Sequence, residues 1–241
     1  MTTKFLSLVL SLVFLSGSAY TSHAQDYARK VQKQLENRTV SLELEFGKKG
    51  GDALEDTLSA LFGANPNGYA TGFIVSDGLV MTAYHVVSGD LSDAKKINLG
   101  FKPGDRLDVK VFIRGCRATV IKIDKDSDLA LLETCRVKQT NPQAFQAKPK
   151  DNEILVLLAR PQGNKMVSRG TFFGLYMFRG QEFWAAKIDS RDGYSGSPVY
   201  NHQAELIGVF TGYDRVQDVA VISPAAKAQK LLEDYMASSK P

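Results

Sequence analysis

In the segment "GYSGSP", Gly193 to Pro198, two glycines and a proline bracket Ser195. Glycine, serine and proline are common turn residues, so the segment by itself is also typical of a surface turn between two strands. Ser195 is the residue in it that could act as a nucleophile. A serine hydroxyl reacts well only when a neighbouring base accepts its proton and a third group orients that base. The rest of the chain must therefore supply a histidine and a carboxylate.

Three histidines are candidates for the base. His23 lies in a segment that we expect to be removed as a signal peptide. His202 lies in "YNHQ", an expected hairpin tip, where a solvated imidazole is the simpler interpretation. His85, in "LVMTAYHVVSG", follows an apolar strand. A histidine there is often structural, but His85 is the base that remains for Ser195.

Asp128, in "DKDSDLALLE", is the candidate for the orienting carboxylate. Asp124 and Asp126 are better interpreted as turn residues. Asp128 directly precedes the apolar run Leu129 to Leu132, which would draw its side chain inward. A buried carboxylate needs a hydrogen-bond partner, and the N–H of a histidine ring is a good one.

Three stretches together carry a family resemblance: "TGFIVSDGLVMTAYHVV", "DSDLALL" and "GYSGSP". In their order His, Asp, Ser they resemble the motifs of the trypsin-like serine proteases. The resemblance extends over residues 39–222, and it is closest to the compact exported bacterial branch that includes the HtrA-type proteases. It implies two antiparallel six-stranded Greek-key barrels, an all-β fold, with the active site in the cleft between them.

The resemblance also implies roles for single residues. His85 would be the general base, Asp128 its orienting carboxylate and Ser195 the nucleophile. Gly193 and Ser195 would offer backbone N–H groups to the oxyanion. An extended substrate would pair, as an added strand, with the segment of Thr211, Gly212 and Tyr213.

Asp189 stands six residues before Ser195, where trypsin-like proteases place the floor of the specificity pocket. A buried carboxylate there would favour substrates with Arg or Lys before the scissile bond. In the alternative, Asp189 faces solvent or pairs with Arg191, and the pocket prefers small aliphatic residues, as in HtrA-type enzymes.

Two departures from the family pattern limit what can be carried over. Trypsin has an acidic residue directly before its serine, whereas this chain has Tyr194. Activation through an ion pair with a newly cut amino terminus is therefore not expected. HtrA-type proteins usually carry a PDZ module after the protease domain, and we expect none here.

The composition is that of a globular protein: 241 residues, 44% hydrophobic and 23% charged. Residues 1–24 combine Lys4, an apolar run from Phe5 to Leu15 and a small-residue end at Ala24, which predicts a secretory signal peptide. Its removal takes away Lys4 and no acidic residue, so the formal charge falls from +4 to +3. The remaining charges are scattered, which argues against nucleic acid or anionic membranes as partners.

Two cysteines, Cys116 and Cys135, remain after export. The midpoint between them falls in a polar turn, between Lys125 and Asp126. A hairpin folded at that turn would place the cysteines opposite each other, within disulfide range. We expect a disulfide in an oxidising compartment, and two buried free thiols are the alternative.

Short strands with turns between them fill residues 69–134 and 153–222, and they include expected strands at 96–101 and 108–116. Apolar residues at helical spacing predict a helix after Pro224. The chain is thus divided into a signal peptide, a lead-in segment, a first barrel, a linker, a second barrel and a C-terminal helix, at residues 1–24, 25–38, 39–140, 141–152, 153–223 and 224–241.

The leading hypothesis is an exported, periplasmic or secreted, serine endopeptidase that acts on polypeptides. One alternative is a catalytically idle relative that uses the barrels as a binding module. Another is an esterase-like hydrolase with the same triad, although strands rather than a helix are expected after Ser195. We expect no cofactor, no metal and no stable membrane insertion once the signal peptide is removed.

Overall fold

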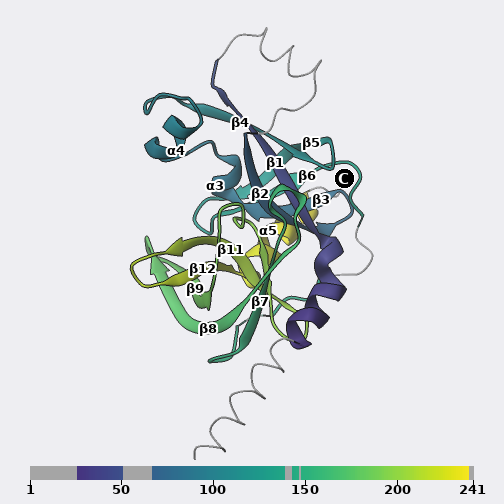
Figure 1. Ribbon diagram of the computed structural model, residues 1–241. Helices are drawn as coiled ribbons and strands as arrows, with labels where there is room; N and C mark the ends of the chain where they lie inside the picture. The colour runs from purple at the N-terminus through teal and green to yellow at the C-terminus, as the bar shows by residue number, and fades with distance from the viewer. Residues whose placement is uncertain (1–25, 51–66, 139–142, 147, 239–241) are drawn as a thin grey trace, which may run out of the picture.

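The computed structural model describes residues 26–50, 67–138, 143–146 and 148–238. In this part of the chain the strands form two closed antiparallel barrels of six strands each, one above the other in Figure 1. The first barrel has the strand order β1-β2-β3-β6-β5-β4, and the second has β10-β11-β12-β9-β8-β7. The predicted all-β double barrel is confirmed. The expected signal peptide, residues 1–24, lies outside the described residues.

The first barrel consists of β1 Thr39–Lys48, β2 Gly68–Ser76, β3 Leu79–Ala83, β4 Leu107–Ile113, β5 Cys116–Asp124 and β6 Leu129–Glu133. The second consists of β7 Ile154–Ala159, β8 Met166–Phe178, β9 Gln181–Ile188, β10 Pro198–Tyr200, β11 Leu206–Asp214 and β12 Val219–Pro224. The helical elements are a helix at residues 26–35, then η1 Glu36–Arg38, α3 Tyr84–Val87, α4 Asp93–Asn98, η2 Pro161–Gly163 and α5 Ala225–Ser238.

Two expected strands of the first barrel are wrong in detail. Residues 96–101 do not form a strand, because α4 covers Asp93–Asn98 and Ser92 caps it by accepting a hydrogen bond from the Lys95 amide. The expected strand at 108–116 is interrupted after Ile113. Arg114 and Gly115 both have positive φ, 52° and 75°, and make the tight turn that joins β4 to β5.

Three apolar clusters hold the molecule together. One fills the first barrel and another fills the second. The third, the shared cluster, lies between the barrels and includes Phe73 and Leu131 of the first and Val156 and Val209 of the second. The shared cluster therefore fixes how the two barrels sit against each other.

Both terminal helices pack on the shared cluster. The helix at residues 26–35, purple in Figure 1, contributes Ala28, Val31 and Leu35, which recur at helical spacing. Helix α5 contributes Ala228 and Leu231 from the other end of the chain. None of the described helices is long and apolar enough to cross a membrane.

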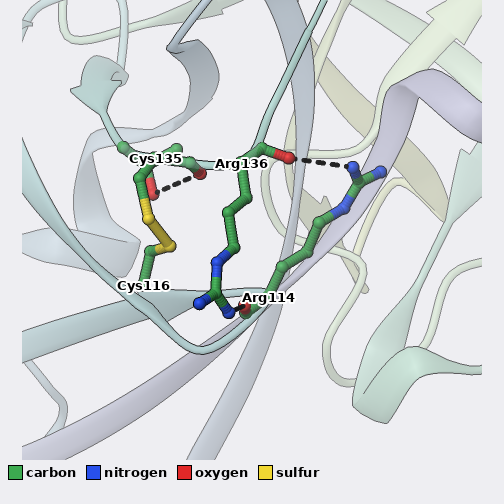
Figure 2. The surroundings of a disulfide bond; sticks show 5 residues. Arg114, Cys116, Cys135 and Arg136 are labelled. Carbon is green, nitrogen blue, oxygen red and sulfur yellow. Dashed lines mark hydrogen bonds between the residues drawn. A yellow bond between two sulfur atoms is a disulfide. The ribbon is translucent and has the colours of Figure 1, made fainter.

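A disulfide joins Cys116 and Cys135, whose Cα atoms lie 5.8 Å apart, so this predicted pairing is confirmed (Figure 2). The expected direct cross-strand position is not. The ladder of β5 and β6 ends at Thr119 opposite Glu133, after a register shift between Val120 and Lys122. The disulfide therefore closes the two chain segments beyond the end of the ladder.

Two arginines next to the disulfide tie the same segments together. The guanidinium of Arg114 donates to the carbonyl of Arg136 at 3.2 Å, and that of Arg136 donates to the carbonyl of Arg114 at 3.5 Å (Figure 2). This end of the first barrel is thus closed by one covalent bond and two hydrogen bonds.

We expect the double variant Cys116→Ser/Cys135→Ser to be less stable than the wild type by about 3 kcal/mol. The disulfide closes a loop with a sequence separation of 19 residues, and without it the unfolded chain gains conformational entropy. Urea unfolding followed by circular dichroism measures the change. Wild-type protein in excess reductant is the control and should unfold near the midpoint of the variant. Free alkylation of both thiols in protein purified without reductant would contradict the pairing.

Candidate active site

Ser195 lies in the loop between β9 and β10, which makes two consecutive turns that share Tyr194. The amide of Tyr194 donates to the carbonyl of Arg191 at 3.1 Å, and the amide of Ser197 donates to that of Tyr194 at 2.9 Å. The third residues of the two turns, Gly193 and Gly196, have φ of 85° and 83°. A positive φ at this position is the mark of a type II turn, which favours glycine. Ser195 is the second residue of the second turn and is half-buried.

Gly196 also brings this loop close to the first barrel. A Cβ at Gly196 would overlap the hydroxyl oxygen of Thr82 and the carbonyl oxygen of Thr71. A Cβ at Gly193 would lie 2.7 Å from the Cβ of Pro161. A side chain at position 196 would therefore push the loop away from β2 and β3, and one at position 193 would push it away from η2.

His85 is positioned by the end of β3. The strand finishes at Ala83, and the short helix α3 begins at the next residue, so the imidazole stands at the rim of the first barrel. Asp128 holds this segment through its backbone and its side chain. Its carbonyl accepts from the Tyr84 amide at 3.0 Å, and its Oδ1 accepts from the His85 amide at 2.9 Å.

The three candidate catalytic side chains form one hydrogen-bonded row. His85 Nδ1 lies 2.7 Å from Asp128 Oδ2, and His85 Nε2 lies 2.8 Å from Ser195 Oγ. The imidazole is 40% exposed and the carboxylate 22%. The row crosses from the first barrel to the second, so the relative placement of the barrels determines its geometry.

Elementary hydrogen-bond chemistry assigns the protons. An ionised carboxylate only accepts, so the Nδ1 that faces Asp128 must carry the proton. In a neutral imidazole the other nitrogen then has a free lone pair. Nε2 therefore accepts from the Ser195 hydroxyl, which is the arrangement needed to remove its proton on attack.

A cavity of about 740 Å³ opens beside Ser195 and His85. Residues of both barrels line it, including Tyr69, Leu91 and Lys95 from the first and Arg191, Gly212, Tyr213 and Arg215 from the second. A concave site of this size between two packed units suits an extended chain or a small ligand.

The predicted substrate-binding segment lies in β11, and the structure separates its residues. Gly212 and Tyr213 line the cavity, whereas Thr211 turns away and donates its hydroxyl to the Val221 carbonyl at 3.2 Å. In the described structure, β10 pairs with β11 only as far as Val209. Phe210 still exchanges backbone hydrogen bonds with Gly196 and Ser197, both at 2.8 Å. The residues of β11 after Phe210 pair with β12, and their other edge is available for an added strand.

The turn between β11 and β12 is ordered by two acidic residues. Tyr213 donates its hydroxyl to Asp218, and this hydrogen bond, with smaller contributions from desolvation and the charges of Asp218 and Asp189, raises the pKa of Tyr213. The amide of Gln217, the hydroxyl of Tyr176 and the amide of Val216 all donate to Asp214 and lower its pKa. These contacts fix the rim of the cavity at Tyr213.

The structure does not place Asp189 at the floor of the cavity, the position that the family resemblance implies. Its side chain is exposed, and it is not among the residues that line the cavity. The expectation of a desolvated carboxylate at the pocket floor therefore lacks structural support, and the solvent-facing alternative fits the structure better. The neighbouring Asp192 is the carboxylate of this loop that lines the cavity.

His202 is not simply a solvated hairpin residue. Its ring centroid lies 5.5 Å from that of Tyr27, on the N-terminal helix, and its Nδ1 lies 3.9 Å from Glu153 Oε1.

Among the described residues, no group of three or more His, Cys, Asp or Glu side chains is arranged to hold a metal ion.

Sequence reasoning missed several residues of the site. Lys95 lies in α4, Arg191 in the loop before β10 and Arg215 in the turn after β11, and no motif marks them as lining one cavity. Thr71 was also missed, although it opens the quoted stretch "TGFIV". Its hydroxyl donates to the Gly193 carbonyl at 2.8 Å. Gly193 lies 122 positions further along the chain, so the sequence around Thr71 contains no sign of this contact.

Comparison with known proteins gives a family and a fold. The family model described as the trypsin-like peptidase domain matches residues 70–209, which is more than half of the chain. No curated protein sequence matches. Solved structures show the same fold at low identity.

One such structure is Rv3671c protease from M. tuberculosis in its active form, with 20% identity, a TM-score of 0.60 and coverage of 84% of this chain and 82% of that one. An inactive form of the same protein matches with 19% identity, a TM-score of 0.58 and coverage of 88% and 92%. Deg5 matches with 18% identity, a TM-score of 0.59 and coverage of 86% and 92%.

We expect Gly196→Ala to reduce the rate at which a fluorophosphonate probe labels Ser195 by at least about 100-fold, because the new Cβ displaces the loop that carries Ser195. Labelling kinetics and a thermal melt measure the effect. Gly104→Ala is the matched control, since a Cβ at Gly104 meets no atom within 4 Å. Equal labelling of the two variants would show that the loop tolerates the displacement.

Proposed function

Because the chain belongs to the trypsin-like peptidase domain family and is thereby a serine-type endopeptidase, we propose that it hydrolyses peptide bonds through Ser195, His85 and Asp128. The observation that supports these roles most strongly is the hydrogen-bonded row of the three side chains. Both of its distances fall within the range of ordinary hydrogen bonds. Polypeptides are the substrates that the family implies.

The proposed reaction starts with attack of Ser195 Oγ on the carbonyl carbon of the scissile bond, as His85 Nε2 takes the hydroxyl proton. Asp128 stabilises the imidazolium that forms. The backbone N–H groups of Gly193 and Ser195 stabilise the negative charge on the carbonyl oxygen. His85 then returns the proton to the leaving amine, which leaves an acyl group on Ser195.

The second half of the reaction uses the same groups. Water loses a proton to His85 Nε2 as it attacks the acyl carbon, and the proton passes to Ser195 Oγ when the acid leaves. The edge of β11 beyond Phe210 would hold the substrate backbone as an added strand, with Gly212 and Tyr213 beside it.

The conformation of the nucleophile loop favours this proposal over an idle binding module. In the type II turn at Arg191–Tyr194, the positive φ of Gly193 sets the orientation of the peptide that carries its N–H. In a type I turn that peptide is reversed. An esterase-like hydrolase is also less well supported, because Ser195 is followed by strand β10 rather than by a helix.

We further propose that the protein is exported and that residues 25–38 remain in the mature chain as its lead-in segment. The disulfide favours an oxidising compartment. Retention of the lead-in segment is supported by Ala28, Val31 and Leu35, which are buried in the shared cluster. Loss of this helix would expose apolar surface on both barrels.

We expect Ser195→Ala and His85→Ala each to lower kcat for a peptide substrate by about 10⁴-fold or more, since members of such a triad act as a unit. Purified variants, compared with wild type on an unfolded protein and with products mapped by mass spectrometry, give the measurement. Circular dichroism should show an unchanged fold. Peptidase activity at the wild-type level in Ser195→Ala would refute the proposed role of this serine.

We expect Asp189→Ser to change the relative kcat/KM for Arg and Leu before the scissile bond by less than about fivefold, because an exposed charge outside the cavity contributes roughly 1 kcal/mol at most. Asp192→Ser is the matched variant and should reduce cleavage after Arg more strongly, because Asp192 lines the cavity. The measurement uses two peptides that differ at that residue alone. A strong preference for Arg that disappears in Asp189→Ser would restore the interpretation based on the sequence.

A further inference from the structure

We propose that Thr71, on β2 of the first barrel, is a positioning residue that holds both oxyanion donors in place. This inference rests on the proposed function of Ser195. Gly193 and Ser195 offer their N–H groups to the oxyanion, and the carbonyls of the same two residues are both bound by Thr71. Its hydroxyl donates to the Gly193 carbonyl at 2.8 Å, and its amide donates to the Ser195 carbonyl at 3.0 Å.

The donor and acceptor partners of the Thr71 hydroxyl are both fixed by the structure. It accepts a hydrogen bond from the Arg160 amide at 3.0 Å, so its proton must point to the Gly193 carbonyl. Thr71 is fully buried, and its own carbonyl accepts from the Thr82 hydroxyl at 2.8 Å. Every polar atom of Thr71 thus has a hydrogen-bond partner. The contacts of its hydroxyl are partly buried and that of its carbonyl is buried, so a lost partner is costly.

The segment after β7 supports the same loop from a second direction. Arg160 supplies the amide that binds Thr71, and the next residue, Pro161, packs against Gly193. The guanidinium of Arg160 donates to the Glu36 carbonyl at 3.2 Å. Burial, with the nearby Arg114, lowers the pKa of Arg160. Contacts therefore run without a break from η1 through Arg160 and Thr71 to Gly193.

These contacts bear on catalysis because the oxyanion donors must be placed to within a fraction of an ångström. Gly193 has no side chain, so its peptide groups are held only by what binds them. Tyr194, on the other side of the turn, packs in the core of the second barrel. Thr71 is the residue that ties the Gly193 and Ser195 carbonyls to the first barrel, which also carries His85. The distance from base to nucleophile and the direction of the oxyanion donors are thereby set by the same strand pair.

The test compares Thr71→Val with Thr71→Ser. Valine has the same shape as threonine but cannot donate to Gly193 or accept from Arg160, whereas serine keeps both hydrogen bonds. We expect Thr71→Val to lower kcat by about 10- to 100-fold with KM within about threefold of wild type, because the oxyanion is bound only in the transition state. Thr71→Ser should recover most of the wild-type kcat.

A second readout separates positioning from stability. A peptide boronate, whose adduct with Ser195 fills the oxyanion site, should bind Thr71→Val more weakly by a similar factor. Binding of the cleaved peptide product should change little. Ser41→Ala is the matched control, because it removes another hydrogen bond between the barrels, from the Gly163 amide to the Ser41 hydroxyl at 3.2 Å, with no contact to Gly193. Its kcat should equal that of wild type.

The outcomes are distinct. If Ser195→Ala lacks activity but folded Thr71→Val keeps the wild-type kcat, or if Thr71→Ser is as impaired as Thr71→Val, the positioning role is overturned and the proposed function stands. If Ser195→Ala retains full activity, both fall. If Thr71→Val does not fold, Thr71→Ala takes its place with the same expected loss of kcat, and a wild-type kcat in that variant overturns the role.

Discussion

The close approach of two backbones at the interface between the barrels is the constraint on which the rest of the site depends. The loop of the second barrel that carries Ser195 lies directly against β2 and β3 of the first, and only a glycine at position 196 fits beside Thr71 and Thr82. Hydrogen bonds from Thr71 to Gly193 and Ser195 then join the two barrels across this contact. Since His85 follows β3 and Ser195 lies in the loop, their separation is fixed by backbone contact rather than by flexible side chains.

Apolar packing keeps that contact closed. The shared cluster takes side chains from both barrels and from the helices at each end of the described chain. Burial of apolar surface is not directional, so it presses the barrels together but does not set their register. The register comes from the hydrogen bonds of Thr71 and from the lack of space at Gly196. Apolar packing thus drives the association of the two barrels, and the polar contacts fix their relative position.

The candidate base also depends on an unusual backbone conformation. Asp128 has a positive φ of 53°, which is uncommon for a residue other than glycine, although aspartate tolerates it better than most. This conformation at the start of β6 lets the carbonyl and the carboxylate of Asp128 both reach the Tyr84–His85 segment. The contacts at α3 compensate the backbone strain, which is of the order of 1 kcal/mol.

The sequence by itself indicated two groups of short strands through local patterns, and the resemblance of three motifs to the trypsin-like proteases implied the double barrel and the three candidate catalytic residues. Alternating apolar residues specify strands, glycine-rich turns separate them, and His85, Asp128 and Ser195 each stand in a short recognisable motif. Local patterns failed at α4, where a capping serine outweighed an alternating run, and at Arg114–Gly115, where a two-residue turn was missed. The tertiary structure alone decided the exposure of Asp189, the meeting of Lys95, Arg191 and Arg215 at one cavity, and the contacts of Thr71. Those features depend on residues far apart in the chain, and the distances between these residues follow from how the two closed barrels pack.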